Sequence, residues 1–254
     1  MTEQYDLEEW LNKKRGNVYN PQISIESTPV SHVGELQDLV AYFARISNDK
    51  SRELGRGTDR LCQYLSDHGH WSPFEMVNVV LGIWDVPRDV TRQMLRHRSF
   101  TFQEYSGRYS EINEKPIKRE ARKQDTTNRQ HSILFNREHG VHTEWEWMQR
   151  EVWETCLRNY RKAIKLDIAK EVARTLIPEG LNASQMFVNG SLRSWMHYVE
   201  ARTSMDTQRE HRILACKIAD ALSPIFPFIN DFTNGDGYED YLDYLKEHDI
   251  EPTT

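Results

Sequence analysis

The densest group of side chains that could do chemistry lies in the segment RHRSFTFQEYSGRYSE, residues 96–111. Three guanidinium groups and one imidazole fall within thirteen residues of this segment: Arg96, Arg98, Arg108 and His97. A guanidinium group can donate two parallel hydrogen bonds to phosphate oxygens, so this cluster of side chains suits a nucleotide phosphate or a pyrophosphate. Ser106 and Gly107 add hydroxyl and amide donors where the backbone can approach an anion. The alternative is a solvated basic helix end, whose cations face the negative end of the helix dipole.

The segment resembles the signature of the flavin-dependent thymidylate synthases, an Arg-His-Arg triplet followed after seven residues by Ser. Three further segments are similar to this family and stand in the same order: ARISN at 44–48, HGHWSPFE at 68–75 and LRSWMHYVEARTSMDTQREHRILA at 192–215. The triplet alone would be weak evidence, but four ordered segments are specific. The resemblance extends over about residues 30–226.

The resemblance implies a reductive methylation of dUMP to dTMP. In that reaction 5,10-methylenetetrahydrofolate supplies the carbon, bound FAD carries hydride and NADPH reduces the flavin. The residues implied to bind dUMP are Gln93, Arg96, Glu104, Tyr105, Ser106, Gly107, Arg108, Arg174 and Arg202. Among them, Arg108 and Arg174 are the implied phosphate partners. Arg202 is the implied catalytic residue, because its charge beside the uracil ring stabilises negative charge there.

The resemblance also implies the residues that hold FAD: Ser47, His70, Ser72, Glu75, Arg96, His97, Arg98, Gln103, Glu104, Ser191, Leu192, Arg193 and His197. Two of them depart from the family pattern, since Gln103 and His197 stand where Asn is found in most or in some members. Both substitutions keep the capacity to form hydrogen bonds, so they affect individual flavin contacts rather than the activity.

Two other kinds of site are less consistent with the sequence. His68 and His70 lack further residues at metal-ligand spacing, so we expect no metal site. Cys62, Cys156 and Cys216 lie far apart and outside any electropositive motif, which predicts free and mostly buried thiols rather than a cysteine nucleophile.

Ser106 leaves two roles open. A serine nucleophile needs a base within hydrogen-bond reach, and His97 is not obviously oriented by an acid. The alternative is that Ser106 donates its hydroxyl hydrogen to the substrate while Arg202 and flavin hydride perform the activation. We expect the second role.

The elements that must position these residues can be read from periodicity and from proline. We expect helices at 33–46, 57–68, 87–98, 143–176, 191–203 and 206–223, strands at 74–86 and 184–190, and a loop at 115–129 that is mobile beside the site. Together these elements predict an α+β fold with one modest, mainly antiparallel sheet and long helices, and a single domain over residues 1–254.

The helix predicted at 191–203 carries two of the arginines implied at the site. Arg193 and His197 are four residues apart and share a face, whereas Arg202 lies nearly opposite Arg193 on a regular helix. Trp195 and Tyr198 are expected in the core. Opposed arginines suit a helix that borders two sites between subunits, and the family resemblance implies a homotetramer.

Composition limits the remaining partners. The 33 basic and 39 acidic residues leave a net charge of −6, which disfavours wrapping of a nucleic-acid backbone. The basic loop at 115–129 contains no aromatic residue for stacking on RNA bases. The first ten residues have neither a basic start nor an apolar run, so we expect a cytoplasmic protein without a membrane partner. The alternative function is a catalytically inactive, nucleotide-binding regulatory protein.

Overall fold

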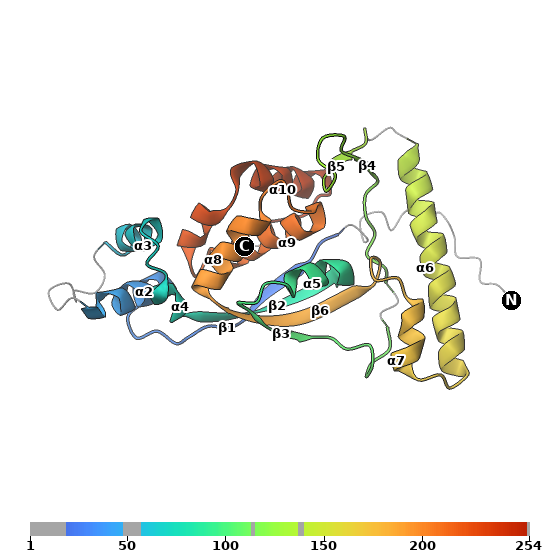
Figure 1. Cartoon of the computed structure of the whole chain (residues 1–254), viewed down its shortest axis with the longest axis horizontal. Helices are drawn as coiled ribbons and strands as arrows, with labels where there is room; N and C mark the ends of the chain where they lie inside the picture. The colour runs from blue at the N-terminus through green and yellow to red at the C-terminus, as the bar shows by residue number, and fades with distance from the viewer. Residues whose placement is uncertain (1–18, 48–56, 113–114, 137–139, 253–254) are drawn as a thin grey trace.

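A computed structural model describes residues 19–47, 57–112, 115–136 and 140–252 (Figure 1). Its main sheet has four strands, each antiparallel to its neighbours, in the order β1-β2-β6-β3. Their bounds are Gln22–Ser27 for β1, Asn78–Pro87 for β2, Ala183–Ser191 for β6 and Thr101–Glu104 for β3. This small antiparallel sheet, accompanied by helices, confirms the predicted α+β fold class.

The main helical layer lies on one side of this sheet in Figure 1. It consists of α5 (Arg88–Met94), α8 (Leu192–Arg202), α9 (Arg209–Leu222) and α10 (Gly235–Glu247). The side chains of β6 alternate between a covered and an open face of the sheet. Met186 and Val188 are buried on one face, while Gln185 and Phe187 on the opposite face are exposed. Every residue of α9 is buried, since this helix packs against α8, α10 and β1.

The other helices lie at the two ends of the sheet (Figure 1). At one end are α2 (Leu36–Ala44), the 3-10 helix η2 (Arg45–Ser47), α3 (Thr58–Asp67) and α4 (Ser72–Glu75). At the other end are α6 (Val141–Lys165), α7 (Lys170–Ala173) and the 3-10 helix η4 (Arg174–Leu176). A hairpin of β4 (Arg122–Gln124) and β5 (Ser132–Leu134) and the 3-10 helix η5 (Pro227–Phe232) complete the fold. No helix in the described ranges is long and apolar enough to cross a lipid bilayer.

Four predicted elements need correction. The strand predicted at 74–86 begins only at Asn78, because residues 72–75 form the short helix α4 with Pro73 in its first turn. The helix predicted at 87–98 ends at Met94, and Pro87 is the last residue of β2. The long helix predicted at 143–176 ends at Lys165, since Asp167 has a φ of 60° that an α-helix cannot continue through. The loop predicted at 115–129 contains β4.

Candidate active site

The basic triplet follows directly after α5 and faces the last residue of α8. Arg202 donates from Nε to Nε2 of His97 over 2.8 Å. Burial, and secondly the Arg202 charge, lower the pKa of His97 from 6.5 to about 4. At neutral pH His97 is therefore an uncharged acceptor that orients Arg202. Arg96 and Arg98, on either side of it, are exposed.

A second set of contacts joins α5 to the start of α9. Gln93 donates from Nε2 to Oε1 of Gln208 at 2.6 Å, and its Oε1 lies 3.2 Å from Nδ1 of His211. The other ring nitrogen of His211 lies 3.0 Å from the hydroxyl of Tyr198. Burial, followed by the Arg202 charge, lowers the pKa of His211 to about 3. The sequence reasoning missed His211, although a polar run inside an apolar-periodic helix was a signal for it.

The signature's serine and glycine form a turn against η4. Ser106 accepts a hydrogen bond at Oγ from the backbone N–H of Arg108, 3.3 Å away. A Cβ atom on Gly107 would lie 3.7 Å from Cδ of Arg174, so the Arg174 side chain passes close to the glycine backbone. Arg108 pairs with Glu171 of α7 at 3.4 Å. Arg108 and Arg174, the two predicted phosphate partners, therefore approach the same turn.

Glu104 and Tyr105 are anchored between this turn and the sheet. Glu104 accepts hydrogen bonds from the hydroxyls of Ser184, at 2.7 Å, and Thr91, at 3.2 Å. Arg88 donates to the backbone carbonyl of Tyr105 at 3.0 Å. These contacts hold the Glu104–Tyr105 segment against β6 and α5.

A pocket of about 340 Å³ opens beside this segment. It is lined by Trp84, Gln103, Glu104, Tyr105, Ser106, Tyr109, Ser110, Gln185, Met186 and Phe187. The rings of Trp84 and Phe187 meet edge to face with centroids 6.1 Å apart. These two aromatic residues were not predicted for the site, because nothing in the sequence indicates that their strands are neighbours.

Of the residues expected at the flavin, Arg96, His97, Arg98, Gln103 and Glu104 lie in the segments described above, and others lie on α4 and in the first turns of α8. Arg193 forms an ion pair with Glu75, and the His197 ring contacts Trp71 at a centroid distance of 4.6 Å. Ser191 caps α8, because its side chain accepts a hydrogen bond from the backbone N–H of Ser194. The remaining members are Leu192, whose side chain is buried, the exposed His70 and Ser72, and Ser47, the last residue of η2.

Thirteen of the predicted site residues thus fall into three groups: Gln93, His97 and Arg202; Glu104 to Arg108 with Arg174; and Glu75, Ser191, Arg193 and His197. Across the described ranges, no hydrogen bond or ion pair joins Arg174 to Arg202. The predicted core positions Trp195 and Tyr198 are fully buried, as expected.

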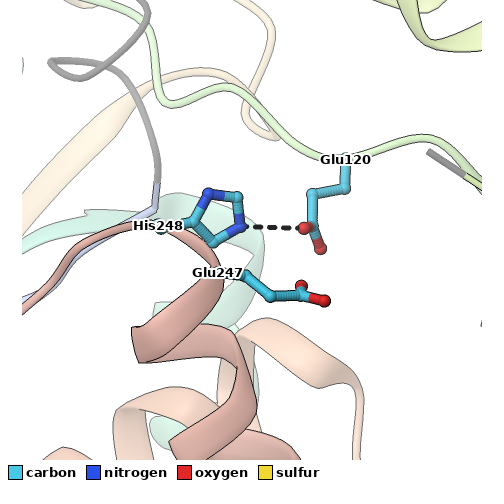
Figure 2. Close-up of side chains that lie close together, drawn as sticks. All are labelled: Glu120, Glu247 and His248. Carbon is cyan, nitrogen blue, oxygen red and sulfur yellow. Dashed lines mark hydrogen bonds and ion pairs between the residues drawn. The ribbon is translucent and has the colours of Figure 1, made fainter. Parts of the chain in front are cut away.

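The cysteines and one acidic cluster lie outside these groups. Cys62, Cys156 and Cys216 are free thiols, and burial raises the pKa of Cys62 to about 12 and that of Cys216 still further. Figure 2 shows Glu120, Glu247 and His248 close together, with a hydrogen bond of 3.0 Å between Glu120 and His248. Arg209 donates to the other Glu120 oxygen at 2.7 Å, so this carboxylate belongs to an ion-pair network.

Comparison with known proteins gives consistent results. A family model, the thymidylate synthase complementing protein, matches residues 30–228. A flavin-dependent thymidylate synthase from Synechocystis is 39% identical over 210 residues, which cover 82% of this chain and 93% of the relative. A probable flavin-dependent thymidylate synthase from Paramecium bursaria Chlorella virus 1 is 37% identical over 207 residues, which cover 82% of this chain and 94% of the relative.

The fold has a counterpart among solved structures. The UMP/dUMP methylase PolB from Streptomyces cacaoi, solved with 5-Br dUMP, superposes with a TM-score of 0.72. It is 22% identical, and the match covers 85% of this chain and 95% of that one. The likeness establishes that the two chains share a fold.

Proposed function

The chain belongs to the flavin-dependent thymidylate synthases, an FAD-dependent family of methyltransferases, and from this premise we propose that it converts dUMP to dTMP by reductive methylation. In this proposal 5,10-methylenetetrahydrofolate supplies the carbon and NADPH the electrons. The nucleotide substrate agrees with the 5-Br dUMP named for the methylase of the same fold. The observation that carries the proposal is the contact between Arg202 and the neutral His97.

Arg202 is the proposed catalytic residue. Among the described residues, His97 is the one acceptor bonded to Arg202, and it takes one of the five N–H donors, which leaves four for a uracil carbonyl. Negative charge that develops on the ring would be stabilised by this oriented cation. The raised pKa values of Cys62 and Cys216 keep both as thiols at neutral pH, which supports activation of uracil without a thiolate from either.

The proposed dUMP phosphate site is the turn at Ser106–Gly107. Arg108 and Arg174 supply two guanidinium groups there, and glycine lets the backbone approach. Ser106 is proposed as a hydrogen-bond donor to the substrate rather than a nucleophile. Its Oγ is occupied by the Arg108 amide, and the nearest histidine of the signature, His97, is engaged by Arg202.

The residues at the start of α8 fit the pyrophosphate of FAD. Arg193 in the first turn of α8, whose side chain is 40% exposed, and the exposed Arg96 and Arg98 supply guanidinium groups for a pyrophosphate. Glu75 holds Arg193 in place, and Trp71 with His197 supplies ring edges nearby. When bound, FAD supplies hydride transfer, while these side chains bind and orient it.

We also propose that the enzyme is a homotetramer with shared active sites. The support is that Arg193, proposed at the flavin, and Arg202, proposed at dUMP, lie nine residues apart on α8 and so on nearly opposite sides of it. A helix that presents two sides to ligands suits active sites that lie between subunits.

The test uses the purified protein. We expect flavin absorption, NADPH oxidation that depends on methylenetetrahydrofolate and dUMP, and dTMP detected by chromatography. The alternative of an inactive nucleotide-binding regulator predicts dUMP binding without dTMP. Absence of flavin absorption even after incubation with excess FAD would refute the proposal. Mass measurement in solution tests the tetramer, and a fully active monomer would exclude it.

A further inference from the structure

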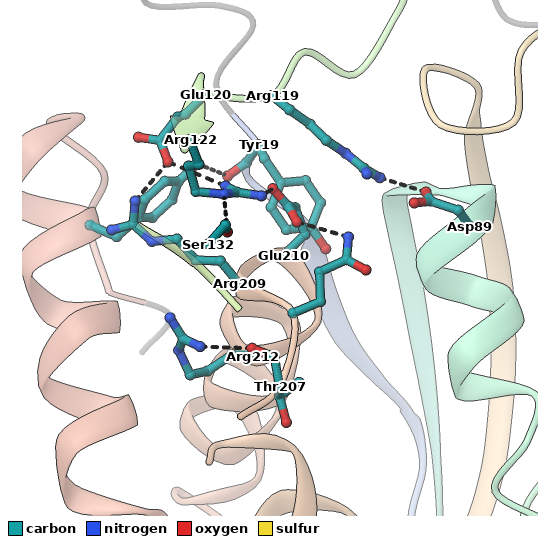
Figure 3. A network of polar contacts seen from close by, with 12 residues as sticks. Tyr19, Asp89, Arg119, Glu120, Arg122, Ser132, Thr207, Arg209, Glu210 and Arg212 are labelled. Atoms are coloured by element: carbon teal, nitrogen blue, oxygen red, sulfur yellow. Dashed lines mark hydrogen bonds and ion pairs between the residues drawn. The ribbon is translucent and has the colours of Figure 1, made fainter. Parts of the chain in front are cut away.

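A buried ion pair between Arg122 and Glu210 (Figure 3) stands at one end of a continuous hydrogen-bond chain that leads to Gln93. Arg122, at the start of β4, donates to Oε1 of Glu210 at 2.5 Å. Glu210 lies in the first turn of α9 and is only 3% exposed. Its second oxygen accepts a hydrogen bond of 2.9 Å from Nε2 of Gln208. Both carboxylate oxygens therefore have a donor.

The charge of Glu210 dictates the direction of the bonds that follow. Burial opposes its ionisation, but the charges of Arg122 and Arg119 outweigh this cost and hold the pKa of Glu210 below its usual value. An ionised carboxylate only accepts hydrogen bonds. The amide NH₂ of Gln208 must therefore face Glu210, which leaves Oε1 of Gln208 facing Gln93.

The fixed orientation of the Gln208 amide in turn fixes the orientation of Gln93 and the tautomer of His211. Gln93 donates from Nε2 to Oε1 of Gln208 at 2.6 Å, so its own Oε1 faces Nδ1 of His211. An amide oxygen is an acceptor, so Nδ1 of the neutral His211 must carry the hydrogen. Its Nε2 is then the acceptor for the hydroxyl of Tyr198, 3.0 Å away.

We propose that Arg122 and Glu210 are positioning residues that fix the amide orientation of Gln93 and the Nδ1–H tautomer of His211. This inference rests on the proposed function, in which Gln93 contacts dUMP. If the chain of bonds reversed, the donor and acceptor atoms of the Gln93 amide would exchange places. A substrate group that finds a hydrogen-bond donor there would then meet an acceptor.

The segment that contains Arg122 is also placed to hold α5. Arg119 pairs with Asp89 in the first turn of α5, one helical turn before Gln93 (Figure 3). One short segment thus binds the beginnings of α5 and α9, the helices that carry Gln93 and His211. The basic run at 115–129 therefore gains a role that its sequence did not indicate.

The test compares Glu210→Gln with Glu120→Gln in FAD-loaded protein labelled with [¹⁵N]histidine. Solid-state ¹⁵N spectra report the His211 tautomer, and a His211→Gln variant identifies its signals. Because Arg122 can only donate, a neutral amide at position 210 would turn its oxygen to Arg122 and its NH₂ to Gln208, which reverses the chain. We therefore expect the Nε2–H tautomer of His211 and a dUMP Kd raised about fivefold to tenfold, the effect of about one hydrogen bond. Glu120→Gln removes the other carboxylate that pairs with Arg122, together with the partner of Arg209, without touching Gln208, and should change neither readout.

Two further variants complete the test. Gln208→Met breaks the hydrogen-bond chain while leaving the Arg122–Glu210 ion pair. His211 should then show both tautomers, and this variant serves as the test even if Glu210→Gln fails to fold. Arg122→Lys keeps a positive charge beside Glu210 and should preserve the Nδ1–H form, whereas Arg122→Met should not. A wild-type tautomer in Glu210→Gln or in Gln208→Met would overturn the inference. Failure of the wild-type protein to bind dUMP would instead refute the proposed function, because the tautomer is read without substrate.

Discussion

Arg202 and His97 are joined by a hydrogen bond of 2.8 Å between Nε of the arginine and Nε2 of the histidine. The contact links the end of α8 to the turn after α5, two places that lie far apart in the chain. It requires His97 to be neutral, because a protonated imidazole has no acceptor atom and would repel the guanidinium. The orientation of the proposed catalytic cation therefore depends on the protonation of a neighbour.

Acidification should destabilise the protein before its carboxylates titrate. The pKa of His97 is lowered to about 4 and that of His211 to about 3, whereas both are near 6.5 in the unfolded chain. Below pH 6.5 the unfolded state therefore binds more protons than the folded state. The contribution of the two histidines to the free energy of unfolding is full above that pH and falls as the pH drops toward 4. Urea midpoints measured between pH 7.5 and 5 check this. His97→Asn should show a shallower loss than wild type, and equal midpoints at pH 7 and pH 5 would contradict the assignment.

Replacing Arg202 should damage turnover far more than replacing Ser106. Loss of an oriented charge in the reacting region costs about 10²–10³ in kcat. Ser106→Ala removes one hydrogen bond of about 0.5–1.5 kcal/mol, so we expect at most a roughly tenfold loss. The measurement is single-turnover dTMP formation with FAD and dUMP saturating. A dead Ser106→Ala enzyme that still binds both, or a covalent adduct on Ser106, would restore the nucleophile hypothesis.

Arg108→Ala and Arg174→Ala should each weaken dUMP binding by about 1.5–3 kcal/mol, the cost of a charge-assisted hydrogen bond. FAD content should change little, because the residues proposed to hold the flavin pyrophosphate lie in another group. Calorimetry with dUMP and the flavin absorbance of the same samples provide both values. Arg92→Ala is the matched control, since Arg92 is an exposed arginine paired with Glu179. Normal dUMP binding combined with lost flavin would reverse the two roles.

Gly237→Ala should destabilise the protein and disturb the Arg202 region. A Cβ atom at this position would lie 1.7 Å from the backbone oxygen of Thr203, the residue directly after Arg202. We expect a loss of about 1–3 kcal/mol in the free energy of unfolding, as for overpacked cores. Gly235→Ala in the same helical turn meets no atom within 4 Å and serves as the control. Equal denaturation midpoints for the two variants would show that α10 can move away freely.

Short-range patterns in the chain were sufficient for the family, the fold class and most helices. The Arg-His-Arg triplet with its following serine, and the apolar periodicity of residues 36–44, are properties of neighbouring residues. The same reasoning failed where local signals were weak or contradictory. The edge strand β1 and the tyrosine-rich helix α10 were not predicted, because neither contains a long apolar pattern, and the break after α6 depends on a single residue, Asp167.

By itself, the sequence identified which side chains are candidates for the chemistry, since guanidinium groups, imidazoles and glycines are recognised by type and spacing alone. Only the tertiary structure decided which of them meet. It placed Arg174 beside Gly107 and Arg202 against His97, and it connected Glu210 to His211 through Gln208 and Gln93. The physical reason is that such contacts form between surfaces of elements far apart in the chain. Periodicity shows which face of a helix is buried but not which partner it is buried against.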